Sequence, residues 1–498
     1  MRSTTTLRSF VRECPGDLVT PVSAFLRLQP LGARFLLESV EGGERSSRYS
    51  FVGLGARARI WADADGTWCA EPEAEPRRLA PPAADPLDVA VQYARQFRCQ
   101  PDPRIPRFLG GLVGYVGYDY ARRLERLGTP PPGDTLPEIM FDFVDTLLVF
   151  DHLLHRLYLA ALSEESSPRA AQVLERFAAA LSYAHPLPHG RGSASGRPRF
   201  RSLMSDDHYR SAVCKLQDHI RAGDIFQAVL SREVEVLDPP PMFEVYRALR
   251  RISPSSYMFY QDFGDVCLTG SSPESAVQLT HRRAALRPIA GTRPRGADEA
   301  EDVRLELELL ASPKERAEHA MLVDLARNDL SRVAVPGTVK VRDLARVERF
   351  SHVMHLVSDV EAELDPERSE ADLIRATFPA GTVSGAPKIR AMQLIDECET
   401  TRRDLYAGCM GYIGLDGTLD MALTIRSAFY AGGRTTIRAG AGVVAGSTPD
   451  GELAECRAKL AALMAAFDSA AHGHALDTTV RGVDAGHSAE PKALGASA

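Results

Sequence analysis

Apolar residues recur at helical spacing in the second half of the chain and at strand spacing between the helical stretches. Four apolar residues stand at i, i+4, i+7 and i+11, which predicts one face of an amphipathic helix: Tyr209, Val213, Leu216 and Ile220. Gly223 is then placed to end this helix, and residues 225–236 are rich in strand formers. Residues 299–328 predict a long helical region that is broken at Ser312 and Pro313, where serine can cap a second helix and proline can occupy its first turn.

The first 184 residues carry both patterns. Strands are expected at 34–40, 48–62 and 146–150, and helices at 85–97 and 168–181. No internal repeat recurs at a fixed period. The pattern as a whole predicts the α+β class.

Two changes in composition divide the chain. Residues 185–201 are rich in Pro, Gly, Ser and Arg without apolar periodicity, which predicts a linker or exposed loop. The last residues, 467–498, lose the core pattern and are expected to form a disordered tail. We therefore predict an N-terminal α+β region over 1–184 and a second region, dense in motifs, over 202–466.

Composition and charge exclude several classes of function. The 498 residues include 59 Lys+Arg and 66 Asp+Glu, a net charge of −7, so no basic surface for nucleic acid or an anionic membrane is expected. No run approaches the roughly 18 apolar residues of a membrane span. Eight cysteines without a CxxC pair or zinc spacing favour a reducing compartment, and we expect a cytoplasmic protein.

Three glycine-rich segments could bring backbone N–H groups close to an anion: residues 288–296, 379–388 and 438–444. Each contains or adjoins Arg or Lys. None has the spacing of a P-loop or of a dinucleotide-binding turn, so nucleotide binding is not indicated. Each segment alone is explained equally well by a tight turn; together they favour an anionic ligand.

Paired carboxylates form a second candidate site. Glu315 and Glu318 stand at i, i+3, and Glu452 and Glu455 repeat this spacing on a second predicted helix. Two such helices could hold Mg²⁺, which prefers oxygen ligands. A solvated helix face would explain either pair alone.

A histidine pair lies in an apolar segment that alternates like a strand. His352 and His355 stand at i, i+3 and lack a third ligand, so the spacing does not indicate zinc. From spacing alone, a core histidine remains the alternative.

Taken together, these segments resemble the chorismate-utilising enzymes, specifically the large (aminase) subunit, component I, of anthranilate synthase. Eleven motifs carry the resemblance in the order of the family, from about residue 36 to 460: LLES (36–39), RYSFVG (48–53), GDIFQAVLSR (223–232), SPSSYMFY (253–260), TGSSPES (269–275), PIAGTRPRG (288–296), EHAMLVDLARNDL (318–330), SHVMHLVS (351–358), FPAGTVSGAPKIRAM (378–392), IRSA (425–428) and AGAGVVAGSTPDGE (439–452).

The resemblance implies the two-sheet sandwich of the family, with helices packed between and around the sheets. It also implies that residues 202–466 bind chorismate and ammonia and release anthranilate and pyruvate. Glu274 matches the general acid, which burial beside other carboxylates would keep protonated. His355 matches the histidine of pyruvate elimination.

The remaining site residues are also assigned by the resemblance. Glu318 and Glu455 would hold Mg²⁺, with Glu315 and Glu452 nearby as outer partners or base. The predicted substrate-binding residues are Gly291, Thr292, Tyr406, Arg426, Gly440, Ala441, Gly442 and Lys459.

Two positions distinguish among the reactions of the related enzymes. Isochorismate synthases place Lys where this chain has Gln227, and aminodeoxychorismate synthases place a nucleophilic Lys where it has Ala290. Both differences favour anthranilate. The alternatives are isochorismate or aminodeoxychorismate synthesis, or a homologue that binds chorismate without turning it over.

Regulation and partners follow from the same resemblance. We expect L-tryptophan to bind as a feedback inhibitor at Ser39, Ser256, Tyr257 and Met258; a packing segment without a ligand is the alternative. The usual NPSPYM run reads SPSSYM here, which leaves the strength of inhibition open. The chain carries no glutaminase segment, so glutamine-dependent activity would need a separate amidotransferase subunit, in the heterotetramer of two large and two small subunits usual for the family.

Overall fold

The computed structural model describes residues 4–40, 48–99, 108–133, 136–164, 169–181, 196–350 and 353–472. Their strands form two large sheets. The tail predicted over 467–498 lies outside these residues from 473 onward, as does His352. No helix in the described ranges is both long and apolar enough to cross a bilayer.

The first sheet has 13 strands. Its order is β12 (Arg199–Ser202), β13 (Gln227–Leu237), β25 (Arg434–Val443), β24 (Ser427–Ala431), β15 (Val266–Ser272), β14 (Tyr257–Asp262), β2 (Ala33–Glu38), β3 (Tyr49–Leu54), β10 (Thr146–Asp151), β11 (Arg156–Ser163), β1 (Thr5–Pro15) and β7 (Phe97–Cys99), with β21 (Gly385–Ala386) beside β13.

The second sheet has 12 strands. Its order is β18 (Ile289–Pro294), β20 (Val353–Glu363), β17 (Arg283–Leu286), β16 (Ser275–Thr280), β23 (Leu419–Leu423), β22 (Cys409–Gly414), β8 (Gly111–Val116), β9 (Ile139–Val144), β4 (Ala58–Asp63), β5 (Gly66–Ala70) and β6 (Arg77–Ala80), with β19 (Lys340–Arg349) beside β20. The predicted α+β class and two-sheet architecture are confirmed.

Both sheets combine early and late parts of the chain. In the first, β14 pairs with β2, so that Met258 lies opposite Glu38; in the second, β22 pairs with β8. Aromatic residues from both sheets meet between them, where the rings of Phe51 and Tyr412 lie 5.8 Å apart. Of the linker predicted over 185–201, residues 185–195 lie outside the described ranges and Arg199 begins β12. The predicted division into regions stays a prediction.

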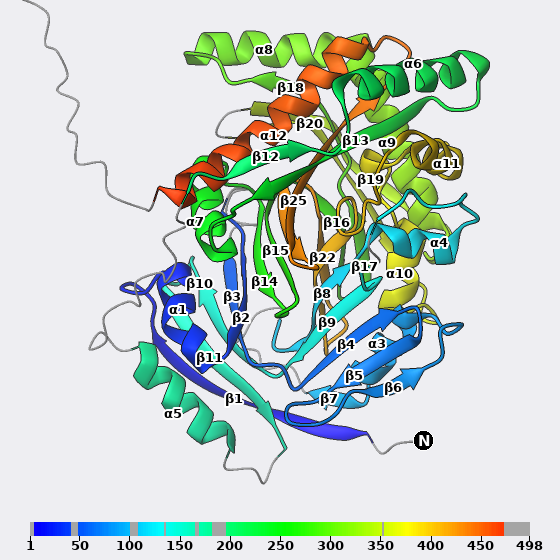
Figure 1. Cartoon of the computed structure of the whole chain (residues 1–498). Helices are drawn as coiled ribbons and strands as arrows, with labels where there is room; N and C mark the ends of the chain where they lie inside the picture. The colour runs from blue at the N-terminus through cyan, green and yellow to red at the C-terminus, as the bar shows by residue number, and fades with distance from the viewer. Residues whose placement is uncertain are drawn as a thin grey trace, which may run out of the picture.

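Helices cover the outer face of the first sheet and surround the second (Figure 1). They are α1 (Pro21–Leu28), α3 (Pro86–Ala94), α4 (Ala121–Leu124), α5 (Arg169–Leu181), α6 (Asp206–Ala222), α7 (Met242–Ile252), α8 (Glu299–Ala311), α9 (Pro313–Ser331), α10 (Glu370–Thr377), α11 (Lys388–Cys398) and α12 (Pro449–Ala471). α12 crosses β25 and packs against α6 and α7 (Figure 1).

Local sequence signals set the helix ends that matter for the site. α6 ends at Gly223, whose φ of 83° favours glycine. α9 begins where predicted: the Ser312 hydroxyl accepts a hydrogen bond from the backbone N–H of Glu315, and Pro313 occupies the first turn. Thr448 caps α12 in the same way. These two caps set where the paired carboxylates of α9 and α12 stand.

Candidate active site

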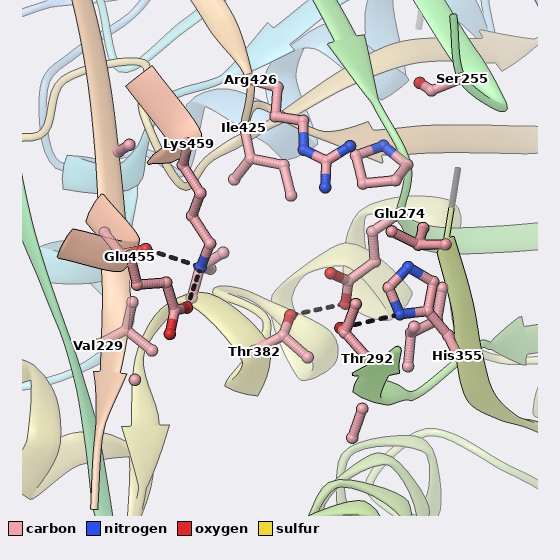
Figure 2. A pocket seen from close by; sticks show the side chains of 18 of the residues that line it. Val229, Ser255, Glu274, Thr292, His355, Thr382, Ile425, Arg426, Glu455 and Lys459 are labelled. Atoms are coloured by element: carbon pink, nitrogen blue, oxygen red, sulfur yellow. Dashed lines mark hydrogen bonds and ion pairs between the residues drawn. The ribbon is translucent and has the colours of Figure 1, made fainter. Parts of the chain in front are cut away.

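A cavity of about 460 Å³ lies where β13, β25, β18 and β20 meet α9 and α12. Most of the predicted catalytic, substrate-binding and metal-binding residues line it: Glu274, His355, Gln227, Gly291, Thr292, Tyr406, Arg426, Gly440, Gly442, Lys459, Glu318 and Glu455. Ala441 and Glu315 do not. Figure 2 shows Lys459 and Glu455 on one wall and Glu274, Thr292 and His355 across from them, with Thr382 between. Residues more than 200 positions apart are therefore brought together as predicted.

Glu274 stays protonated to a higher pH than an ordinary glutamate. Its carboxyl group is buried in the wall between β15 and β16, although the residue as a whole is partly exposed, and this burial raises its pKa to about 7. Thr382 Oγ1 donates a hydrogen bond of 2.7 Å to Glu274 Oε1, which opposes the shift, as do the positive charges of Arg426 and Lys459. The expected cause was wrong in one respect: burial raises this pKa, while the neighbouring charges are cations rather than carboxylates.

His355 is oriented by the strand beside it. Its Nδ1 lies 2.9 Å from the carbonyl oxygen of Gly291 and 3.1 Å from Thr292 Oγ1. Because a carbonyl can only accept, Nδ1 carries the proton in this arrangement and Nε2 is left with a lone pair. Burial lowers the pKa of His355, which favours the neutral ring. The histidine is therefore equipped to act as a base through Nε2.

The paired carboxylates face each other from α9 and α12. Burial raises the pKa of Glu318, and the negative charges of Glu315 and Glu455 raise it further, so these groups lie close enough to repel. Lys459 Nζ lies 2.8 Å from Glu455 Oε1 and donates a hydrogen bond of 2.9 Å to the Gly440 carbonyl. The cavity thus brings anionic and cationic groups to one wall.

The outer carboxylates have different surroundings. Glu315 Oε1 lies 3.3 Å from a guanidinium nitrogen of Arg293, and Glu315 is absent from the cavity lining. Glu452 Oε2 is buried and has no hydrogen-bond partner within the described ranges. Among the described residues, no three His, Cys, Asp or Glu side chains are arranged to hold a metal. Two facing carboxylates with an unsatisfied acidic neighbour still suit Mg²⁺, which takes its remaining ligands from water or substrate oxygens.

The third glycine-rich segment is not a turn. Gly440, Ala441 and Gly442 lie in β25, where they pair with Ser231, Leu230 and Val229 of β13. Strand alternation turns Gly440 and Gly442 toward the cavity wall and leaves Ala441 fully buried away from it. A Cβ on Gly440 would stand 3.0 Å from the Tyr406 hydroxyl, so glycine keeps this wall open beside Tyr406.

The two residues that distinguish related reactions both line the cavity. Gln227 begins β13, and its side chain opposes the rise in the pKa of Glu318, while its Oε1 is buried and has no hydrogen-bond partner among the described residues. Ala290 lies on β18, one residue before Gly291, and offers no nucleophile. Neither position can supply the amine of a lysine.

The predicted inhibitor residues lie where β2 and β14 pair. Ser39 follows β2, and its hydroxyl is buried without a partner in the described part of the chain. The backbone N–H of Val40 donates to the Ser255 carbonyl at 3.2 Å. Tyr257 donates to Asp420 at 3.2 Å across to the second sheet. Ser256 lines the active-site cavity itself, so this segment adjoins the candidate active site.

Sequence reasoning missed two cavity residues. Thr382 lies within the quoted PAGTVSGAPK segment, but its hydrogen bond to Glu274 follows from a turn that only the fold places there. Arg438 lines the cavity from β25 and was noted only as a nearby cation. The residue types gave no spacing signal for either contact.

Comparison with known proteins agrees with this geometry. The family described as chorismate binding enzyme matches residues 32–465, and the chain belongs to this family. Within it, the chain is 45% identical to anthranilate synthase component 1 of Thermus thermophilus over 94% of this chain and 99% of the relative. It is 41% identical to the protein of that name from Pseudomonas aeruginosa, over 88% and 90% of the two chains. The resemblance to component 1 is confirmed.

Solved structures show the same fold. Anthranilate synthase component I of Streptococcus pneumoniae superposes with a TM-score of 0.73 at 32% identity, covering 90% of this chain and 98% of that one. The menaquinone-specific isochorismate synthase of Escherichia coli gives a TM-score of 0.69 at 22% identity, over 94% and 96% of the two chains. At 22% identity, the similarity to the isochorismate synthase is evidence for the fold alone.

Proposed function

We propose that this chain is the aminase component of an anthranilate synthase, which converts chorismate and ammonia to anthranilate, pyruvate and water. Its similarity to relatives named anthranilate synthase component 1 supports the reaction class. The observation that carries the proposal is the pairing, in one cavity, of a carboxylic acid that stays protonated to about pH 7 with a neutral histidine.

The first step requires an acid. The ammonia lone pair forms a bond to ring carbon C2, the ring double bonds shift, and the C4–oxygen bond breaks. Glu274 donates its proton to the departing hydroxyl, which leaves as water. Thr382 then stabilises the carboxylate that remains, because its hydroxyl already donates to Oε1.

The second step requires a base. His355 Nε2 removes the proton from C2, the ring becomes aromatic, and the C3–oxygen bond to the enolpyruvyl group breaks. The enolate that is released becomes pyruvate when it takes up one proton at its methylene carbon, while His355 carries the proton removed from C2. Thr292 and the Gly291 carbonyl hold the ring of His355 in the required tautomer.

Two sets of groups would recognise the two substrate carboxylates, and Lys459 of the first set adjoins Glu455 of the second. Arg426, Tyr406 and Lys459 can supply cationic and hydroxyl donors. Glu318 and Glu455 would hold Mg²⁺, which neutralises one carboxylate and orients the ring when it is bound. Bound Mg²⁺ is thus part of the proposal.

Gln227 and Ala290 favour ammonia as nucleophile and anthranilate as product. A glutamine amide cannot deprotonate water, and alanine cannot form a covalent adduct with the ring. Both side chains reach the cavity in which the reaction would occur. This supports anthranilate as the product over isochorismate or aminodeoxychorismate.

We also propose tryptophan as an inhibitor, a cytoplasmic location, and an amidotransferase subunit in a heterotetramer of two large and two small subunits. The buried, unpartnered hydroxyl of Ser39 supports the first of these. Turnover of chorismate with ammonium by the purified chain tests the reaction. Light scattering after addition of a glutaminase component tests the assembly, and a mass other than that of the tetramer would contradict it.

A further inference from the structure

A buried charge cluster that the proposed chemistry does not use adjoins the cavity, whose lining includes its member Arg438. Arg403 and Arg438 both pair with Glu399, at 2.7 Å and 3.0 Å, and all three side chains are buried. Glu399 also accepts hydrogen bonds from the backbone N–H and hydroxyl of Ser231. These contacts lower the pKa of Glu399, so the cluster remains ionised.

Arg403 uses its other donors on the wall of the cavity. One nitrogen donates to the Val383 carbonyl at 2.7 Å, and another to the Val229 carbonyl at 2.5 Å. Val229 lies on β13, and its own N–H donates to the carbonyl of Ser384 in the turn. Arg403 therefore ties β13 to the turn that contains Thr382.

This turn is the one that contacts the acid. Thr382 precedes Val383 in a short 3-10 helix (Gly381–Val383), and its hydroxyl donates to Glu274. A Cβ on Gly381 would come within 2.0 Å of Leu325, so the turn lies tightly against α9 on its other side. The position of the Thr382 hydroxyl thus depends on where Val383 is held.

We propose that Arg403 is a positioning residue of the active site, which holds Thr382 in hydrogen-bonding distance of Glu274. The inference rests on the proposed function for its kinetic test. It assigns to Arg403 a role beyond core stability: by fixing the turn, it controls how readily Glu274 gives up its proton.

Only arginine can make this set of contacts. Its planar fork bonds Glu399 and two carbonyls at once, whereas a lysine has one nitrogen and cannot span all three. Arg403→Lys keeps the buried charge, so Glu399 stays paired, while one of the two carbonyls loses its donor. Thr382 is then free to move away from Glu274.

The test is the pH profile of turnover with ammonia, at constant free ammonia. The hydrogen bond from Thr382 stabilises the ionised form of Glu274, so its loss raises the pKa of this acid. Thr382→Val should move the alkaline limb upward by about one pH unit, and Arg403→Lys should move it in the same direction. The double variant should shift no further than Thr382→Val alone.

Arg122→Lys is the matched control. Arg122 pairs with Asp119 and Asp396 at 2.7 Å and 2.8 Å, outside the cavity lining. The Arg122→Lys variant should have a lower melting temperature, and the alkaline limb of its pH profile should stay where it is in the wild type. An unshifted limb in Arg403→Lys, or shifts that add in the double variant, would overturn the inference. If Arg403→Lys does not fold, Glu399→Gln replaces it, with a smaller upward shift expected and no shift contradicting the inference.

A second readout needs no turnover. Infrared difference titration of the Glu274 carboxyl, with Glu274→Gln as the blank, should show the same upward shifts in Thr382→Val and Arg403→Lys. A wild-type chain without turnover would count against the proposed function, while the infrared shift would still decide the role of Arg403. An unchanged titration in Arg403→Lys would overturn that role alone.

Discussion

Thr382 donates a 2.7 Å hydrogen bond to Glu274 although 108 residues separate them in sequence. The contact joins the turn before α11 to the end of β15 and identifies which oxygen of the acid is already occupied. Glu274 Oε2 is then the oxygen available to donate to the substrate. The acid is thus oriented as well as protonated, since the rest of the wall holds the turn.

Removing the acid should cost activity and increase stability. In Glu274→Gln we expect kcat to fall by about 10²–10⁴. Because the pKa of Glu274 rises from 4.5 to about 7 on folding, its ionisation destabilises the fold as pH increases through that range. The variant should gain about 2–3 kcal/mol more stability at pH 8 than at pH 5, which melting curves at the two pH values measure. An equal change in stability at the two pH values would show that the pKa of Glu274 is not raised in the folded protein.

Metal binding should depend on Glu318 and on pH. Because burial raises the pKa of Glu318, protons compete with Mg²⁺ for this carboxylate at a higher pH than they would for an ordinary glutamate, so affinity should increase as the pH rises. Calorimetry without substrate measures this directly. Glu318→Gln and Glu455→Gln should each weaken binding more than the roughly 10–100-fold that loss of an outer partner costs.

Glu315→Gln is the matched control for the metal, because Glu315 is on the same helix and pairs with Arg293. As an outer partner at most, Glu315 should cost no more than the roughly 10–100-fold in Mg²⁺ affinity when it is replaced. Wild-type affinity in Glu318→Gln would place the metal elsewhere.

Loss of the base should separate the two steps of the reaction. In His355→Ala the acid and the ammonia site are intact, so chorismate should still be consumed while anthranilate formation falls by about 10²–10⁴. Chromatography should then show an aminated intermediate that retains the enolpyruvyl group. If chorismate consumption stops as well, His355 acts before elimination.

Tryptophan inhibition should depend on the serine-rich loop beside the cavity, residues 253–256. Ser255 accepts from Val40 through its carbonyl and donates through its hydroxyl to the Ser272 carbonyl at 2.7 Å, two residues before Glu274. Ser39→Ala should weaken tryptophan binding about fivefold to tenfold. Ser255→Ala should retain binding by calorimetry but lose part of the inhibition. Unchanged binding and inhibition in both variants would leave this loop a packing segment.

Sequence patterns were sufficient where the signal was local. The capped start of α9 at Ser312 and the end of α6 at Gly223 follow from residue types alone, because caps and left-handed glycines act within one turn. The cavity residues were identified through the family motifs rather than through periodicity. The local pattern could not show that residues 438–444 form a strand, since glycine favours turns and only pairing with β13 overrides that preference.

Contacts between distant segments lay beyond the sequence. Nothing in the spacing of Arg403, Val383 and Thr382 indicates that one guanidinium anchors the turn beside the acid. Burial was predicted as a cause of the raised pKa of Glu274, but the cations that oppose the rise were missed for the same reason, because Arg426 and Lys459 lie far from Glu274 in the chain. Such relationships depend on the packing of two sheets.

The most direct test of the account uses the purified chain with chorismate, Mg²⁺ and an ammonium salt at alkaline pH. Anthranilate fluorescence, with products separated by chromatography, reports both the rate and the identity of the product. We expect anthranilate and pyruvate in equal amounts, and no turnover after EDTA. Isochorismate or aminodeoxychorismate as the product, or chorismate binding without turnover, would contradict the account.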